Sequence, residues 1–239
     1  MTNKNVAVFT LPVLFLLLVL TSSAIRAEDG NSNPWMDWLR GSSESADTQY
    51  RRGMDYFYGT GVDENRETAV QWLRRAADRG HADAQYMIGW CYEHGAGIPE
   101  DKTEAVKWYR KAAEQGEDYA QYALGINYFY GTNVPEDKVE AAMWFRKAAE
   151  QGNALAQFQL GMCYSSGTGV AADRTEAVEW HLKAAEQGHA VAQHMLVTPY
   201  LLGLGVPKDE TTAIEWLRES AGQGYADAQF QLGSALKCC

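Results

Sequence analysis

The chain has little cysteine and lacks the common enzyme motifs, and each of these absences excludes a class of protein. Its 239 residues include four cysteines and six prolines. Cys91 and Cys163 lie far apart, and Cys238 and Cys239 are the last two residues, which excludes a small fold held together by many disulfides. The sequence also lacks a Walker motif, H-E-x-x-H, C-x-x-C and G-x-S-x-G. The familiar signatures of nucleotide-binding, zinc-dependent and serine-dependent enzymes are therefore missing.

Basic residues are also scarce relative to acidic ones. The chain has 21 lysines and arginines against 31 aspartates and glutamates, a formal net charge of −10. Removal of residues 1–27 would take away Lys4 and Arg26 but no acid, and would leave −12. Such a surface repels phosphate backbones and anionic lipids. We therefore expect neither nucleic acid nor a membrane surface as a partner.

The first 27 residues are typical of a secretory signal peptide. Lys4 gives a positive start, residues 6–20 are apolar, and small residues around Ala24 and Ala27 offer two cleavage sites. The apolar run is short for a membrane span and contains Pro12. We predict a periplasmic or secreted protein with no membrane insertion after cleavage. An uncleaved anchor is the alternative.

The rest of the chain repeats with a period of 36 residues. Full units begin at residues 46, 82, 118, 154 and 190, and the first half of a sixth begins at residue 226. The hexapeptide KAAEQG occurs three times at this interval. One residue that keeps the same step is a glutamine, found at Gln49, Gln85, Gln121, Gln157, Gln193 and Gln229. Periods of this length indicate a repeat architecture.

Each unit reads as two helices joined by a turn. In the second unit, Ala84, Ile88 and Cys91 recur at helical spacing, and residues 94–97 (HGAG) then break the pattern. A second amphipathic stripe runs over residues 105–113 and stops at Gly116. One helix pair cannot bury its own apolar face. The sequence therefore predicts an all-α fold, a solenoid of antiparallel helix pairs.

Small residues predict where these helices approach each other closely. Gly89 lies on the first helix of the second unit, and Ala112 and Ala113 lie on the second. We expect Trp108 and its equivalents to fill the space between neighbouring pairs. KAAEQG is then the end of a second helix, with alanines packed inward and Glu and Gln facing water.

The motif A-x-A-Q-Y/F-x-L-G, followed by G-x-G-V and A-x-x-W-x-x-K-A-A-E-Q-G, resembles the Sel1-like repeat, a relative of the tetratricopeptide repeat. The resemblance covers residues 46–239. It implies a right-handed superhelix that acts as a non-enzymatic adaptor or scaffold for a protein or peptide partner. It implies no cofactor.

A cysteine-rich branch of this family suggests an alternative function. The resemblance associates that branch with disulfides between the two helices of a repeat, and with penicillin-binding or β-lactamase activity. Here Cys91 and Cys163 lie on first helices, and no second helix carries a cysteine, so that pairing cannot form. We expect both to be small buried residues. For Cys238 and Cys239 a vicinal bridge, free thiols and an intermolecular link all stay open.

Two departures from the repeat pattern have structural consequences. In the fifth unit Val197 replaces the close-approach glycine, and Pro199 falls inside the first helix. We expect a kink or a reoriented repeat over residues 195–203, because proline removes a helix hydrogen bond. Asn133 replaces the second glycine of a turn, where asparagine tolerates the left-handed conformation.

The five histidines show no metal-binding signature. His81 and His189 occupy one repeat position, directly after the glycine that ends a second helix. We interpret them as polar groups at the junctions between repeats. We expect no catalytic site and no metal site.

A partner-binding site is expected where the units differ. Positions five, eight and nine residues after each repeated glutamine share one face of the first helix. In the first three units they carry large side chains. We name the following set the aromatic face and predict that it lines a concave groove: Met54, Phe57, Tyr58, Trp90, His94, Phe129 and Tyr130. The alternative is that these residues only complete the packing between repeats.

Residues 28–45 form a polar segment that contains Trp35 and Trp38. We expect this linker to cap the open, apolar end of the first repeat, and its second possible use is to bind a partner. A third reading of the whole chain, a secretory-pathway quality-control component, is open because the leader alone does not distinguish compartments.

Overall fold

The computed structural model describes residues 44–237, and the repeat array from Ser45 onward forms one compact unit. The predicted leader, the segment with Trp35 and Trp38, and the Cys238–Cys239 pair lie outside the described residues. All regular structure within residues 44–237 is α-helical. In this range no helix has both the length and the apolar character that crossing a membrane requires.

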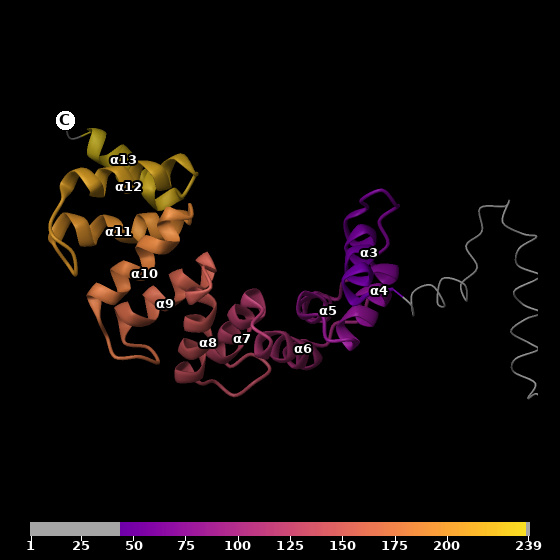
Figure 1. Ribbon diagram of the computed structural model, residues 1–239. Helices are drawn as coiled ribbons and strands as arrows, with labels where there is room; N and C mark the ends of the chain where they lie inside the picture. Colours follow the sequence, from indigo (N-terminus) through magenta and orange to yellow (C-terminus); the bar gives the residue numbers. More distant parts are fainter. Residues whose placement is uncertain (1–43, 238–239) are drawn as a thin grey trace, which may run out of the picture. The chain divides into compact units, whose positions relative to one another are not determined.

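Each full unit folds into two helices of 13 residues. The first helices are α3 (Ala46–Tyr58), α5 (Ala82–His94), α7 (Asp118–Tyr130), α9 (Ala154–Ser166) and α11 (Ala190–Leu202). The second helices are α4 (Arg66–Asp78), α6 (Lys102–Glu114), α8 (Lys138–Glu150), α10 (Arg174–Glu186) and α12 (Glu210–Gly222), and α13 (Ala226–Lys237) begins the sixth unit. From α3 to α13, each helix packs on the next, so the pairs follow one another in chain order (Figure 1). The predicted α-solenoid is confirmed.

Capping residues set where the helices begin and end: side chains cap the starts, and glycines end the first helices. The second helices start after an Asn or Asp, as where Asp101 accepts a hydrogen bond from the Glu104 N–H at 2.9 Å. Each first helix of a full unit ends at a glycine in the left-handed conformation, such as Gly95 with φ 64°. The residues that cap the starts of the first helices vary from unit to unit: Ser45, His81, Glu117, Asn153 and His189. The histidines at the junctions are therefore helix caps.

Close approach within a pair depends on a glycine of the first helix. A Cβ atom added to Gly125 would lie 2.4 Å from ring atoms of Phe145, so only glycine lets α7 and α8 pack as they do. The same relation holds for three other pairs: Gly53 with Leu73, Gly89 with Tyr109, and Gly161 with His181. In the fifth unit, Val197 and Leu217 are buried in one apolar cluster instead.

The tryptophans fill the space between neighbouring pairs, as predicted. Trp144 of α8 is buried in a cluster with Ala113 of α6 and Leu124 of α7. Trp108 occupies the equivalent place one unit earlier, with residues of α4 and α5. Each tryptophan thus packs against the preceding unit, which makes the stability of one repeat depend on the next.

The two departures have different outcomes. Asn133 adopts the left-handed conformation with φ 64°, as expected. Pro199 lies inside α11 but does not interrupt it. The helix starts and stops at the same repeat positions as the other first helices. The helix ends normally at Gly203, whose N–H donates to the Pro199 carbonyl at 2.8 Å. The proline leaves the repeat boundaries unchanged.

The repeated glutamines hold three helices together, and here the sequence interpretation of KAAEQG was incomplete. Gln121 is buried and donates to the Ala113 carbonyl at the end of α6. Its side-chain oxygen accepts from Gln151, the KAAEQG glutamine at the end of α8, at 2.8 Å. Gln151 also donates to the Gly116 carbonyl of the preceding unit at 2.9 Å. The glutamine of KAAEQG therefore faces water only in part, because its amide bonds to the fold.

The outer side of the first repeat is polar. Thr48 and Arg51 are exposed where Ala84 and Met87 of the second repeat are buried. The guanidinium group of Arg52 lies 4.6 Å from the Trp72 ring, in the way that the Arg74 side chain covers Trp108. Polar side chains thus stand at these positions of α3, and the role of residues 28–45 as a cap stays a prediction.

Candidate partner-binding surface

The aromatic face lies at the C-terminal ends of α3, α5 and α7, and its members differ in exposure. Phe57 is only 7% exposed and belongs to the core of the first two repeats, where its ring meets Trp90 edge-on at 5.6 Å. Its neighbour Tyr58 is 66% exposed. Met54 is half-buried against the same core. Phe57 therefore contributes to packing between repeats, and Tyr58 presents its ring to solvent.

The third repeat reproduces this arrangement. Phe129 is half-buried, 6.1 Å from the Phe145 ring, and the Lys138 ammonium group lies 4.1 Å from the centre of its ring. Tyr130 is 62% exposed. Tyr58 and Tyr130 each meet the preceding phenylalanine edge-to-face at 5.1 Å. Both tyrosines are thus held in place by a phenylalanine that is anchored in the fold.

The second repeat carries a different pair. Trp90 is half-buried and packs against the cores on both sides of α5. His94 is exposed, stacks on Trp90 at 4.2 Å, and its Nδ1 lies 3.0 Å from the Trp90 carbonyl oxygen. Between them in sequence, Glu93 accepts a hydrogen bond from the Tyr109 hydroxyl at 2.6 Å, and burial together with this bond raises the pKa of Tyr109. Trp90 therefore supports the fold as well as the surface.

The structure thus separates the seven predicted residues into three groups. Phe57 is core; Met54, Trp90 and Phe129 are half-buried; Tyr58, His94 and Tyr130 are exposed. Their role in binding stays a prediction.

The seven predicted residues do not include other exposed apolar side chains. Leu202 is 64% exposed at the repeat position of Tyr58 and Tyr130. Val139 and Met143 are exposed one helical turn apart on α8, where the second repeat has Thr103 and Lys107. That apolar-for-polar exchange was the signal available in the sequence, because the helical stripe predicts a polar residue at both positions.

The titratable groups of residues 44–237 are not arranged as a metal site, since no three His, Cys, Asp or Glu side chains come together to hold an ion. Cys91 and Cys163 are free and buried, and burial raises the pKa of each thiol to about 11. Burial likewise raises the pKa of Glu117, the cap of α7, to about 7. These shifts follow from structural positions in the repeat.

Comparison with known proteins agrees with this architecture. A family model described as the Sel1 repeat matches residues 46–81, 82–117, 118–153, 154–189 and 190–225. A solved Sel1 repeat protein from Oxalobacter formigenes is 39% identical, with a TM-score of 0.71, over 77% of this chain and 73% of that one. No curated protein matches the chain.

A second solved structure is a protective antigen present in uropathogenic Escherichia coli strains, which displays the SLR fold. It is also 39% identical, with a TM-score of 0.76 over 85% of this chain. The match covers 44% of the antigen, so this chain spans less than half the length of that protein.

Proposed function

Because the chain belongs to the Sel1 repeat family, whose members generally mediate protein–protein interactions, we propose that it is an exported, non-enzymatic scaffold. Its partner is a protein or peptide. The scaffold binds that partner through the exposed part of the aromatic face, which is formed by Tyr58, His94 and Tyr130.

One observation carries this proposal: two tyrosines are exposed at the same repeat position, and each rests on an anchored phenylalanine. Leaving a large aromatic ring in water has no benefit for the stability of the repeat. Tyrosine is enriched among the residues that dominate binding energy, because it offers a rigid apolar ring and a hydroxyl group. A ring that is already held in place also loses less conformational entropy on binding.

Export is supported by the sequence of residues 1–27, with its positive start, short apolar run and small residues before the cleavage sites. The acidic repeats favour a partner that is not itself strongly acidic. The enzymatic alternative has less support. Cys91 and Cys163 are free, so within residues 44–237 no disulfide joins the two helices of a repeat.

The test compares how substitutions in the aromatic face and on α8 change the affinity for the partner. The mature chain is used to capture its partner from the native host, and the captured protein is then made for binding measurements. We expect the Tyr58→Ser/Tyr130→Ser variant to lower affinity by tenfold or more and to leave the melting temperature unchanged, because both rings are exposed. The control is Val139→Thr/Met143→Lys, which gives α8 the residues of the second repeat and should bind normally.

Loss of binding in the α8 control alone would move the binding surface to α8 and overturn the proposal. Normal binding by both variants would show that the aromatic face is not the site. Hydrolysis of a chromogenic β-lactam by the purified chain would contradict the non-enzymatic assignment.

A further inference from the structure

Two histidines and a phenylalanine come together at the junction between the fourth and fifth repeats. His189 stacks on Phe158 with ring centres 4.7 Å apart, and the ring of His181 lies 5.7 Å from Phe158. We call these three residues the histidine cluster. Phe158 belongs to α9, His181 to α10, and His189 caps α11, so the cluster joins the helices of two repeats.

His189 performs its capping role only when one ring nitrogen is unprotonated. Its Nδ1 accepts a hydrogen bond from the Ala192 N–H at 3.1 Å. A protonated imidazole has N–H groups at both nitrogens and cannot accept this bond. It would also place a positive charge at the N-terminus of α11, which is the unfavourable end of the helix dipole. Protonation therefore removes one stabilising contact and adds a repulsive one.

His181 is a second group that must stay neutral. It is 4% exposed, packs against Gly161, and its Nε2 has no hydrogen-bond partner. Burial and, to a smaller extent, the nearby His189 lower its pKa to about 4, and a hydrogen bond to the Phe158 backbone opposes part of this change. Burial also lowers the pKa of His189. A proton on either ring would be a charge placed in an apolar environment.

The three helices of the cluster place no carboxylate against its rings. Helix α12, which packs on α11, brings Glu219 to Gln193, from which it accepts a hydrogen bond at 3.0 Å. Helix α9 contains no Asp, Glu, Lys or Arg, and α11 has His194 as its one charged or basic residue, bonded to Gln231. On α10, Glu176 accepts from the Trp180 indole, and Lys183 lies over the same ring. The remaining α10 charges, Arg174, Glu179 and Glu186, are solvent-exposed. The charge effects described above come from the histidines and the backbone alone.

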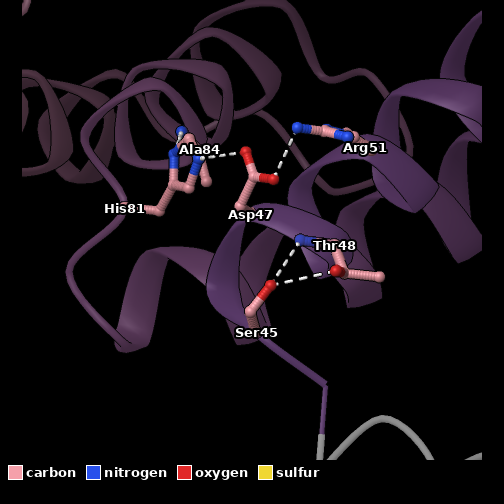
Figure 2. A network of polar contacts seen from close by, with 6 residues as sticks. All are labelled: Ser45, Asp47, Thr48, Arg51, His81 and Ala84. Carbon is pink, nitrogen blue, oxygen red and sulfur yellow. Dashed lines mark hydrogen bonds and ion pairs between the residues drawn. The ribbon is translucent and has the colours of Figure 1, made fainter.

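The first junction supplies an internal comparison (Figure 2). His81 caps α5 in the same way, with its Nδ1 3.3 Å from the Ala84 nitrogen, and stacks on Tyr50. Its Nε2, however, lies 3.9 Å from the carboxylate of Asp47, which also pairs with Arg51. The repeat position of Asp47 is occupied by Leu155 in the fourth unit, and that of His181 by Leu73 in the first. Only the later junction combines two histidines without a carboxylate.

We propose that the junction between the fourth and fifth repeats is an acid-sensitive hinge. Protonation of the histidine cluster weakens the start of α11 and its packing on α9 and α10. The first junction keeps its structure over the same pH range, because it has Leu73 in place of the second histidine and a carboxylate, Asp47, 3.9 Å from its one histidine. Acid thus loosens the fifth repeat selectively.

Proton binding determines the sign and the size of the change in junction stability with pH. A solvated histidine has a pKa near 6.5, so between pH 6.5 and about 4 the opened junction binds more protons than the closed one. The closed junction is therefore fully stable above pH 6.5 and loses stability as the pH falls through this window. For His181 alone, the opening equilibrium rises up to about 30-fold between pH 7.5 and pH 5.

Hydrogen exchange of the full chain at pH 7.5 and pH 5 measures this opening, after correction for the intrinsic pH dependence of exchange. We expect the amides of residues 184–196 to lose protection tenfold or more relative to residues 76–88, the equivalent segment of the first junction. The decisive variant is His181→Phe/His189→Asn, which installs the residues that the third unit has at these positions, Phe145 and Asn153. It should abolish the difference.

The matched control is His81→Asn, which should leave the acid-induced loss at residues 184–196 intact. Equal pH responses of the two junctions in the natural chain would overturn the proposal, and this comparison needs no variant to fold. A pH response that persists in the double variant would overturn it as well. If the double variant does not fold, His189→Asn alone replaces it and must reduce the acid effect.

Discussion

Replacing Gly125 by alanine tests the contact that sets the distance between the two helices of a repeat. Gly125 lies on α7, opposite the fully buried ring of Phe145 on α8. The new Cβ atom would lie 2.4 Å from both Cδ1 and Cε1 of that ring. Non-bonded carbon atoms normally lie roughly 3.5–4.0 Å apart, so the ring must move by more than 1 Å or so. Neighbouring side chains leave it no room.

Two effects of opposite sign decide the size of the change. Alanine is a better helix former than glycine by about 1 kcal/mol. Overpacking a core costs about 1–3 kcal/mol, and the upper end applies here because two atoms of a buried, rigid ring clash. We therefore expect a net loss of about 2 kcal/mol in the free energy of unfolding.

The chain supplies both a control and a rescue. Gly233 occupies the same repeat position in α13, but a Cβ there would meet no atom within 4 Å. Gly233→Ala should therefore stabilise the chain by up to about 1 kcal/mol. In the fifth unit Val197 faces Leu217, which suggests that Phe145→Leu makes room for the alanine. The two substitutions should then cost less together than the sum of their separate costs.

Urea unfolding followed by circular dichroism at 222 nm measures all five proteins: the natural chain, the three single variants and the Gly125→Ala/Phe145→Leu double variant. The reasoning fails if Gly125→Ala is as stable as the natural chain, because the helices would then be free to separate without cost. It also fails if Gly125→Ala stabilises the chain as Gly233→Ala does, since helix propensity alone would then explain both changes.

Three further predictions concern the core, the thiols and the leader. Trp144→Ala should cost about 3–5 kcal/mol, measured by urea unfolding, because the buried indole fills the space between two repeats; an unchanged unfolding curve would mean that it is not core. Iodoacetamide at pH 8 should label Cys91 and Cys163 slowly in the native chain and fully in denaturant, because burial raises both thiol pKa values to about 11; rapid native labelling, read by peptide mass spectrometry, would contradict this. N-terminal sequencing of protein from its native host should begin at Ile25 or Glu28, and recovery of Met1 in the membrane fraction would argue against cleavage.

The periodicity of the sequence was enough to predict much of the fold. The 36-residue repeat predicted paired helices, the glycines predicted the turns and the close approaches, and the tryptophans predicted the packing between units. These predictions succeeded because the helix period places residues three and four apart on one face. A residue that recurs at one position in five units is constrained in the same way each time.

The sequence was less able to predict which residues of the aromatic face are exposed, and two neighbouring residues show why. Phe57 and Tyr58 look alike in the sequence, yet Phe57 is buried and Tyr58 is exposed. Helical spacing assigns both to one edge of α3, and only the position of α5 and its Trp90 decides which ring is covered. Helical spacing predicts the direction in which a side chain points. Whether that side chain is buried depends on the side chains of the neighbouring helix.

Polar contacts show the same division between sequence and tertiary structure. The sequence alone determined that glutamine and histidine recur at fixed repeat positions. Only the tertiary structure decided that Gln151 bonds to Gln121, thirty residues earlier, and that His189 caps a helix beside a second histidine. A polar side chain has several donors and acceptors, and which of them finds a partner depends on distances between helices. Those distances are set by the glycines, alanines and aromatic rings that pack between the helices, so they exist only once the repeats have stacked.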